Sequence, residues 1–166
     1  MITCRTFHSL GLVLVVSIAV SAAGQQTFQT DVMIGDEKVQ ITIKKAPFDY
    51  TAHRFERAKR GELLVDGMPA LGTDASDPRT HLSEFRVDWN GRLILVPKSL
   101  FQFVFNPSLE PKTSSFENKG SVLVLGGLAG DSVLVQLSGG DGAGSFNSWW
   151  VISKNGRVDR FVNGPP

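Results

Sequence analysis

The chain has 166 residues, with 17 Lys and Arg, 16 Asp and Glu, and one cysteine. This length is enough for one hydrophobic core. The charges nearly balance and no long basic run occurs, which argues against nucleic acid as a partner, because phosphate contacts need clustered Lys and Arg.

The first 24 residues have the pattern of a secretory signal peptide. Arg5 precedes an apolar run at residues 10–20, and small residues follow at positions 21–24. The run is shorter than the roughly 20 residues that span a bilayer, which makes an uncleaved anchor the alternative. We therefore expect a signal peptide over residues 1–24, a single domain over residues 25–166, and a secreted or periplasmic location.

Cleavage of this segment would change the composition of the domain. It removes Cys4 and one of the 17 basic residues, Arg5, but no acid, so 16 basic residues balance 16 acidic ones. The remaining domain has no cysteine, and its core must stabilise it without disulfides.

The first predicted hairpin lies near the start of the domain. Residues 27–34 and 38–44 alternate apolar and polar side chains on either side of a turn at residues 35–37. Alternate residues of a strand share a face, so the second segment has one apolar face, formed by Val39, Ile41 and Ile43.

Asp66-Gly67 predicts a second reversal, because Asp-Gly tolerates the positive φ that a two-residue hairpin turn requires. The turn joins residues 63–65 to residues 68–71. Pro69 has no amide hydrogen to donate, so its strand is expected at an edge of the sheet.

Two Asn-Gly pairs predict the other hairpins. A two-residue turn at Asn90-Gly91 places one apolar face in the core, and the other face, with Glu84 and Asp88, is at best half-buried. The core face consists of Phe85, Val87, Ile94 and Val96. The same turn at Asn155-Gly156 pairs Trp150 with Phe161 and Trp149 with Val162.

The middle of the chain adds one expected helix and two strands. Leu100, Phe101, Val104 and Phe105 recur at helical spacing, and Ser99 is a candidate cap, so we expect a short helix there. Residues 121–125 and 132–138 read as strands. Together the elements predict an all-β fold, a single-domain antiparallel β-sandwich with one short helix, with a closed antiparallel β-barrel as the alternative.

The loop at residues 72–84 gathers polar residues that suit ligand binding. It includes Asp74, Asp77, Arg79 and His81, which we take as candidate ligand-binding residues. Loops carry function more often than cores do. The alternative is a set of Asx and proline turns with a solvated ion pair.

The glycine-rich stretch GGDGAGSFNSWW, at residues 139–150, joins two expected strands. No Lys follows its last glycine, which excludes a phosphate-binding P-loop. Asp141 is its only acid, whereas calcium needs several oxygen ligands. We therefore expect a turn in which Asp141 accepts backbone hydrogen bonds, and no cofactor, with calcium binding by Asp141 as the alternative.

Trp149 and Trp150 are neighbours in an expected strand, so their side chains point to opposite faces. One of them can fill the core, and the other must cover a second interface or face solvent. An exposed Trp could stack on a sugar ring or anchor a protein partner. Both tryptophans are therefore candidate binding residues.

Hydrolysis by a serine nucleophile is not indicated. Gly130-Asp131-Ser132 is similar to the esterase signature GDS, but that chemistry needs a histidine base, which comes late in the chain of those esterases. His53 and His81, the two histidines of the predicted mature chain, both come earlier. No cysteine or HExxH motif suggests zinc.

Six short motifs also occur along the domain: DGMPALGTD, DPRT, NGR, VPKS, FNPSL and SGGDGAGS. Their order resembles a pattern in small secreted bacterial β-rich proteins of unknown function. The resemblance implies a β-rich domain and a periplasmic or secreted setting, and it supplies no catalytic residue.

From these observations we expect an exported, non-catalytic binding or interaction module with a protein or carbohydrate partner. We expect contact with a membrane only through the signal segment before cleavage. The alternative is a secreted hydrolase that uses a pair of carboxylates in glycoside-type chemistry.

Overall fold

The computed structural model of the chain describes residues 15–20, 25–59, 61–73, 77–112, 121–127, 129–139 and 145–163. These residues form three antiparallel sheets. The largest has the order β1-β2-β3-β7-β8, with bounds Val15–Val20, Gln26–Ile34, Glu37–Pro47, Thr80–Trp89 and Arg92–Leu95. The second has the order β12-β11-β10-β9, with bounds Val158–Asn163, Phe146–Ser153, Ser132–Gly139 and Val122–Gly126.

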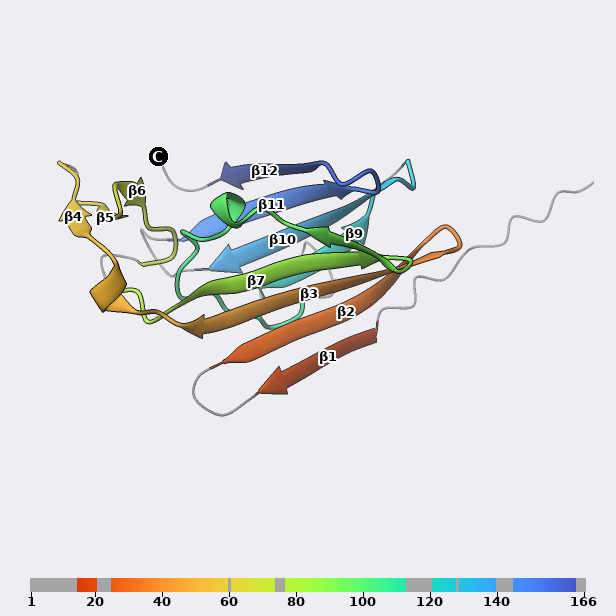
Figure 1. Ribbon diagram of the computed structural model, residues 1–166, viewed down its shortest axis with the longest axis horizontal. Helices are drawn as coiled ribbons and strands as arrows, with labels where there is room; N and C mark the ends of the chain where they lie inside the picture. Colours follow the sequence, from red (N-terminus) through yellow and green to blue (C-terminus); the bar gives the residue numbers. More distant parts are fainter. Residues whose placement is uncertain are drawn as a thin grey trace, which may run out of the picture.

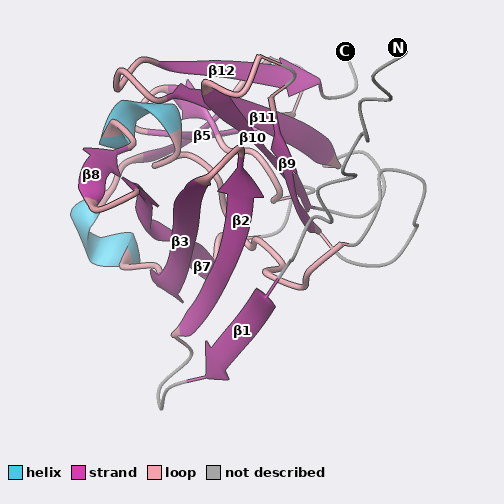
Figure 2. Ribbon diagram, turned by 90° about the vertical axis from the view of Figure 1, so that its right-hand side faces the viewer, coloured by secondary structure: helices cyan, strands magenta, loops and turns pink. Residues whose placement is uncertain are grey.

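The two larger sheets face each other as a β-sandwich (Figures 1 and 2). Both sheets contribute fully buried side chains to one core, as alternating strands with one apolar face should. Examples from the two sheets are Ile41, Val87, Val135 and Trp150. The expected all-β sandwich is confirmed, and the described strands form no closed barrel.

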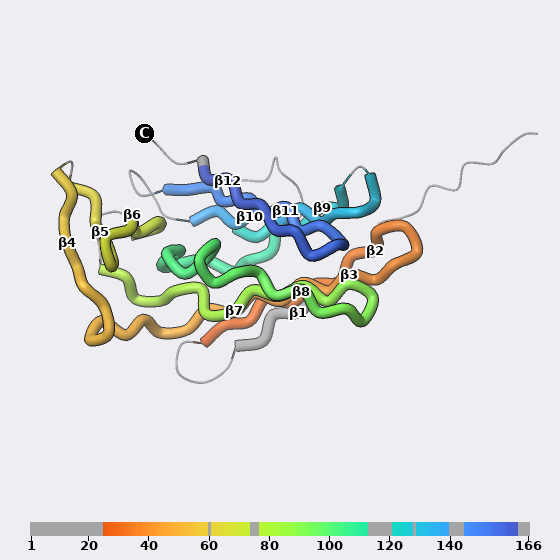
Figure 3. The backbone as a smooth tube through the Cα atoms, turned by 45° about the horizontal axis from the view of Figure 1, so that its top comes forward, coloured from red at the N-terminus to blue at the C-terminus, as the bar shows by residue number. Residues whose placement is uncertain are grey.

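A small third sheet caps one end of the sandwich (Figure 3). It consists of β4 (Phe55–Arg57), β5 (Leu63–Val65) and β6 (Met68–Pro69). Asp66 and Gly67 form the β5–β6 turn with φ of 52° and 79°, as the Asp-Gly pair predicts. The expectation that Pro69 lies in an edge strand is also confirmed.

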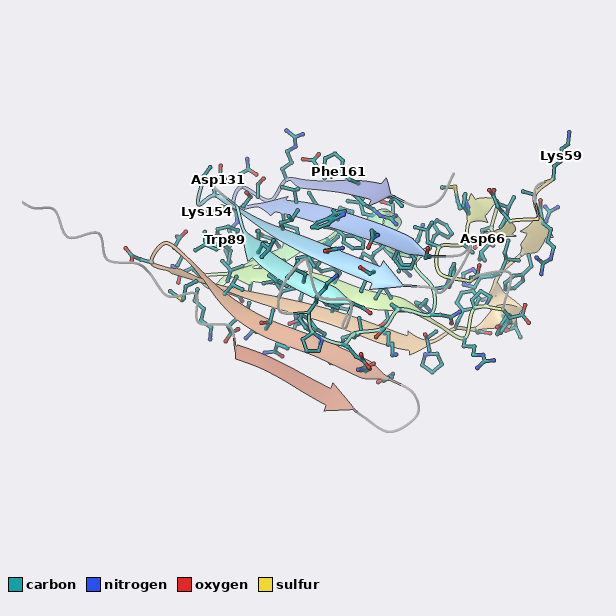
Figure 4. The ribbon with its side chains drawn as sticks, turned by 180° about the vertical axis from the view of Figure 1, so that it is seen from behind. Lys59, Asp66, Trp89, Asp131, Lys154 and Phe161 are labelled. Carbon is teal, nitrogen blue, oxygen red and sulfur yellow. The ribbon has the colours of Figure 1, made fainter. Side chains whose placement is uncertain are left out.

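The other end of the sandwich is joined by a cross-sheet polar contact (Figure 4). Glu37 accepts a hydrogen bond from Nε1 of Trp89 at 2.9 Å and pairs with Nζ of Lys154 at 2.7 Å. Glu37 and Trp89 belong to the larger sheet, whereas Lys154 follows β11. This carboxylate therefore ties the two sheets together.

The predicted register of the Asn90-Gly91 hairpin is confirmed, because Val87 pairs with Ile94. In the first hairpin Ile34 pairs with Glu37, so the turn has two residues rather than the expected three, residues 35–37. The predicted core residues are buried: Val39, Ile41, Ile43, Phe85, Val87, Ile94 and Val96.

The predicted register of the tryptophan hairpin is wrong by one residue. Trp149 pairs with Phe161, and Trp150 pairs with Arg160. The connection has three residues rather than two, because the amide of Ser153 donates to the carbonyl of Arg157, and Gly156 takes a φ of 97° within the turn. A type I turn followed by a glycine with positive φ is the usual three-residue hairpin loop.

The expected short helix is a single turn of 3-10 helix, η2 (Lys98–Leu100). Ser99 lies inside it and does not cap it, because the N-cap position is Pro97. Val104 and Phe105 are buried in isolated β-bridges rather than on a helix. Another 3-10 turn, η1 (Tyr50–Ala52), lies between β3 and β4.

Residues 15–20, which lie within the predicted signal segment, form β1 at the edge of the larger sheet. Its register with β2 runs from Val15 opposite Asp31 to Val20 opposite Gln26. Removal of the segment would leave β2 as the edge strand. No helix in the described part of the chain is long and apolar enough to cross a membrane.

Candidate functional site

A cavity of about 270 Å³ lies where the small sheet meets the end of the sandwich. We call it the histidine pocket and define it by its lining residues. These come from the segments on either side of η1, from β5 and its turn, from β7, and from η2 and the residues after it: Phe48, His53, Val65, Asp66, His81, Lys98, Gln102, Phe103 and Phe105.

The floor of the histidine pocket is a small aromatic core that is separate from the core of the sandwich. Phe48, Val65 and Phe105 are buried together there, and Phe103 packs against them. The rings of Phe48 and Phe105 meet edge to face with centroids 5.0 Å apart. This core attaches the small sheet to the sandwich and gives the cavity apolar walls.

His53 and Asp66 form a hydrogen-bonded pair at one side of the pocket. Nδ1 of His53 lies 2.7 Å from Oδ2 of Asp66, and the backbone amide of Arg54 donates to Oδ1 at 2.9 Å. The Arg54 amide and then His53 lower the pKa of Asp66 below its ordinary value of 3.8. Asp66 is therefore a carboxylate at neutral pH and holds the imidazole of His53 in a defined orientation.

Phe48 brings the two histidines together. Its ring stacks on His53 with a centroid distance of 4.7 Å and meets His81 edge to face at 5.6 Å. Phe48 follows β3, whereas His81 is on β7, the neighbouring strand of the same sheet. The pairing of these two strands thus delivers both imidazoles to one cavity.

His81 is half-buried in the pocket wall, and its Nδ1 makes no hydrogen bond with any described residue. Burial is the largest cause that lowers the pKa of His81 below 6.5, followed by the charge of Lys98 and by His53. The imidazole is therefore neutral at neutral pH. A buried polar atom without a partner destabilises the folded state.

Lys98 brings a positive charge to the pocket from the start of η2. Its side chain lines the cavity, and its charge reaches His81. Within the described part of the chain, no carboxylate lies within ion-pair distance of Lys98. An exposed lysine at the rim of an apolar cavity can attract and hold an anionic group.

The chemistry of the lining limits what the pocket can do. Among the described residues that line it, there is one carboxylate, that of Asp66, and no hydroxyl or thiol group. Among the described residues, no group of three or more His, Cys, Asp or Glu is arranged to hold a metal ion. The arrangement instead offers two imidazoles, one ammonium group and an amide around an aromatic floor.

The structure separates most of the predicted ligand-binding residues. Asp74 and Asp141 lie outside the described residues, so the calcium alternative at Asp141 stays a prediction. Asp77 and Arg79 are exposed. Of the candidate residues in the predicted polar loop that the structure describes, only His81 lines the histidine pocket.

The two tryptophans lie on opposite faces of β11, as predicted. Trp150 is fully buried, and its Nε1 donates to the carbonyl of Leu100 at 3.1 Å. Trp149 is half-buried on the outer face, opposite Phe161, which is 58% exposed and points away from the sandwich (Figure 4). Neither tryptophan lines the histidine pocket.

Sequence reasoning missed His53, Asp66 and Lys98 as site residues. The Asp66-Gly67 pair predicts only a turn, and His53 lies in a segment without a clear strand or helix pattern. The one signal for His53 is that the predicted mature chain retains just two histidines, His53 and His81, and no sequence signal indicates Asp66 or Lys98. Their approach depends on the pairing of β3 with β7 and of β4 with β5.

Comparisons with protein-family models, with curated proteins and with solved structures find no match to this chain. The functional argument therefore rests on the geometry of the histidine pocket.

Proposed function

We propose that the mature protein is an exported binding module whose ligand site is the histidine pocket. The observation that supports this proposal is the convergence of His53, His81 and Lys98, from three separate segments, on one cavity with aromatic walls. Small-molecule sites are typically concave and mostly apolar, with a few polar groups that orient the ligand. The cavity fits a small ligand rather than a polymer chain.

Binding agrees better with the lining than hydrolysis does. Hydrolysis by a serine, threonine or cysteine nucleophile would need a hydroxyl or thiol beside a base, and the described lining offers neither group. A glycoside hydrolase needs two carboxyl groups that flank the scissile bond. Asp66 is the single acid among the described lining residues, and Arg54 and His53 already bind it.

The proposed location outside the cytoplasm is supported by the sequence of residues 1–24. A basic residue, a short apolar run and small residues are the parts of a cleavable signal. The proposed ligand is thus a small molecule of the periplasm or the extracellular space. The near balance of charge gives no support to nucleic acid as the partner.

A ligand-observed NMR screen of a small-molecule fragment library tests the proposal. Gln102 lines the cavity and Ser99, three residues earlier, is exposed and does not line it. Gln102→Trp should fill the cavity and abolish the signals of the bound fragments, whereas Ser99→Trp should leave them unchanged. Fragments that bind equally well to both variants, or the absence of any bound fragment, would count against the histidine pocket as the ligand site.

A further inference from the structure

The polar groups of the histidine pocket have more hydrogen-bond donors than acceptors. Asp66 is the one carboxylate among the described lining residues, and both of its oxygens already take part in hydrogen bonds, with His53 and with the Arg54 amide. Lys98 has three donor hydrogens and no ion-pair partner among the described residues. The imidazole of His81 lines the cavity, and Gln102 adds an amide, which has both a donor and an acceptor. A ligand that supplies an acceptor would therefore pair with the ammonium group of Lys98.

Lys98 and His81 both line the histidine pocket, so one ligand in it could contact both side chains. The charge of Lys98 is also one of the causes that lower the pKa of His81. A carboxylate has two acceptor oxygens and can bind an ammonium and an imidazole N–H together. Charge-assisted hydrogen bonds of this kind are stronger than those between neutral groups.

The other walls of the histidine pocket are apolar and favour a ligand whose body is apolar. Phe103, Phe105 and Val65 present apolar surface to the cavity, and none of them offers a side-chain hydrogen bond. An apolar body would bury its surface against these residues. Resting on the proposed function of the pocket as a ligand site, we propose that the ligand is a small monocarboxylate with an apolar body, held by Lys98 and His81 at its carboxylate.

Three probes of the same shape test this ligand class by isothermal titration calorimetry with the purified protein. The probes are 3-phenylpropanoate, 3-phenylpropanamide and 3-phenylpropylammonium, which present an anion, a neutral amide and a cation on one apolar body. The carboxylate should bind about tenfold or more tightly than the amide, the difference that one charge-assisted hydrogen bond supplies. Acetate, which keeps the anion but lacks the apolar body, should bind far more weakly.

A pair of lysine variants separates the local contact from general electrostatic attraction. Lys98→Met removes the ammonium group at the pocket and should weaken 3-phenylpropanoate about tenfold to a hundredfold. Lys59→Met makes the same change of charge at an exposed lysine on the outer end of the small sheet, away from Asp66 (Figure 4), and should leave the affinity unchanged. His81→Phe keeps a ring against Phe48 and should also weaken the carboxylate.

The possible results test the carboxylate preference separately from the proposed function of the pocket as a ligand site. Equal binding of all three probes would keep the pocket as a ligand site and overturn the carboxylate preference. Preference for the ammonium probe would also overturn it and would make Asp66 the anchor. Equal loss of affinity in Lys98→Met and Lys59→Met would contradict a local contact at the pocket. If no probe binds, the inference fails, whereas the proposed function is judged by the fragment screen with Gln102→Trp.

Discussion

Asp66, in the turn that joins β5 to β6, holds His53 through a 2.7 Å contact between Oδ2 of Asp66 and Nδ1 of His53. Asp66 also takes the left-handed φ of 52° that this tight turn uses. One residue thus reverses the chain and orients an imidazole at the histidine pocket. A residue chosen for its turn geometry is also part of the candidate site.

The Asp66 contact predicts a dependence of stability on pH. The folded state lowers the pKa of Asp66 below 3.8, so the folded protein keeps this carboxylate charged at lower pH than the unfolded chain does. Its stabilising contribution is present above about pH 4 and is lost as the pH falls through the folded pKa. Asp66→Asn, which tolerates the same φ, should lower the melting temperature at pH 6, and the difference from wild type should shrink at pH 3. A constant difference over this range would show that the charge of Asp66 does not contribute.

The burial of His81 predicts a second dependence of folding stability on pH, at a higher pH than that of Asp66. The pKa of His81 in the folded protein lies below 6.5, first because the side chain is half-buried and then because of the charges of Lys98 and His53. His53 is itself held by Asp66 at the same pocket. The unfolded chain therefore takes up a proton more readily, and the protein loses stability as the pH falls through about 6.5. His81→Phe should match wild type near pH 8 and be the more stable of the two near pH 5.5, as measured by thermal unfolding. The same difference at both pH values would contradict this account.

The corrected register of the tryptophan hairpin predicts unequal roles for Trp149 and Trp150. Trp150 is fully buried, bonds to the carbonyl of Leu100 and lies under the guanidinium of Arg160, 5.4 Å from its ring centroid. Trp150→Phe should cost about 1–3 kcal/mol in unfolding free energy, because it leaves a cavity and an unpaired carbonyl. Trp149→Phe, on the outer face, should cost less than about 1 kcal/mol. Chemical denaturation measures both, and equal losses would mean that the two faces are wrongly assigned.

Substitutions of Val87 and Asp88 test which face of the Asn90-Gly91 hairpin is buried. Val87 is fully buried, so Val87→Ala should cost about 1–3 kcal/mol. Asp88 is half-buried and accepts a hydrogen bond from the amide of Gly91 at 2.7 Å. Asp88→Ala should therefore cost about 0.5–2 kcal/mol, as the loss of a capping side chain does, rather than the negligible amount expected of an ordinary surface residue. Asp88→Asn keeps an acceptor and should recover most of this loss in the same denaturation experiment.

Export predicts a defined new N-terminus. Mass spectrometry of the secreted or periplasmic protein should find the chain beginning between Ala22 and Gln26, after the small residues at positions 21–24. The mature chain should unfold cooperatively, because β2 keeps its full pairing with β3 when β1 is absent. Retention of Met1 on a membrane-bound product would contradict cleavage.

The sequence by itself determined the fold class and most of the hairpins. Alternation with period two and the turn residues Asp66-Gly67 and Asn90-Gly91 depend on neighbours in the chain, so they can be read without a structure. The Asn155-Gly156 loop was misassigned by one residue, because Asn-Gly is compatible with both a two-residue and a three-residue turn. That difference decided that Phe161, rather than Val162, lies opposite Trp149.

Only the tertiary structure decided where the candidate site lies. His53, Asp66, His81 and Lys98 are far apart in the sequence and belong to separate elements, and no local pattern links them. They meet because β3 pairs with β7 and because Phe48 and Phe105 pack the small sheet onto the end of the sandwich. Such packing depends on contacts between distant segments, which hydrophobic periodicity does not encode.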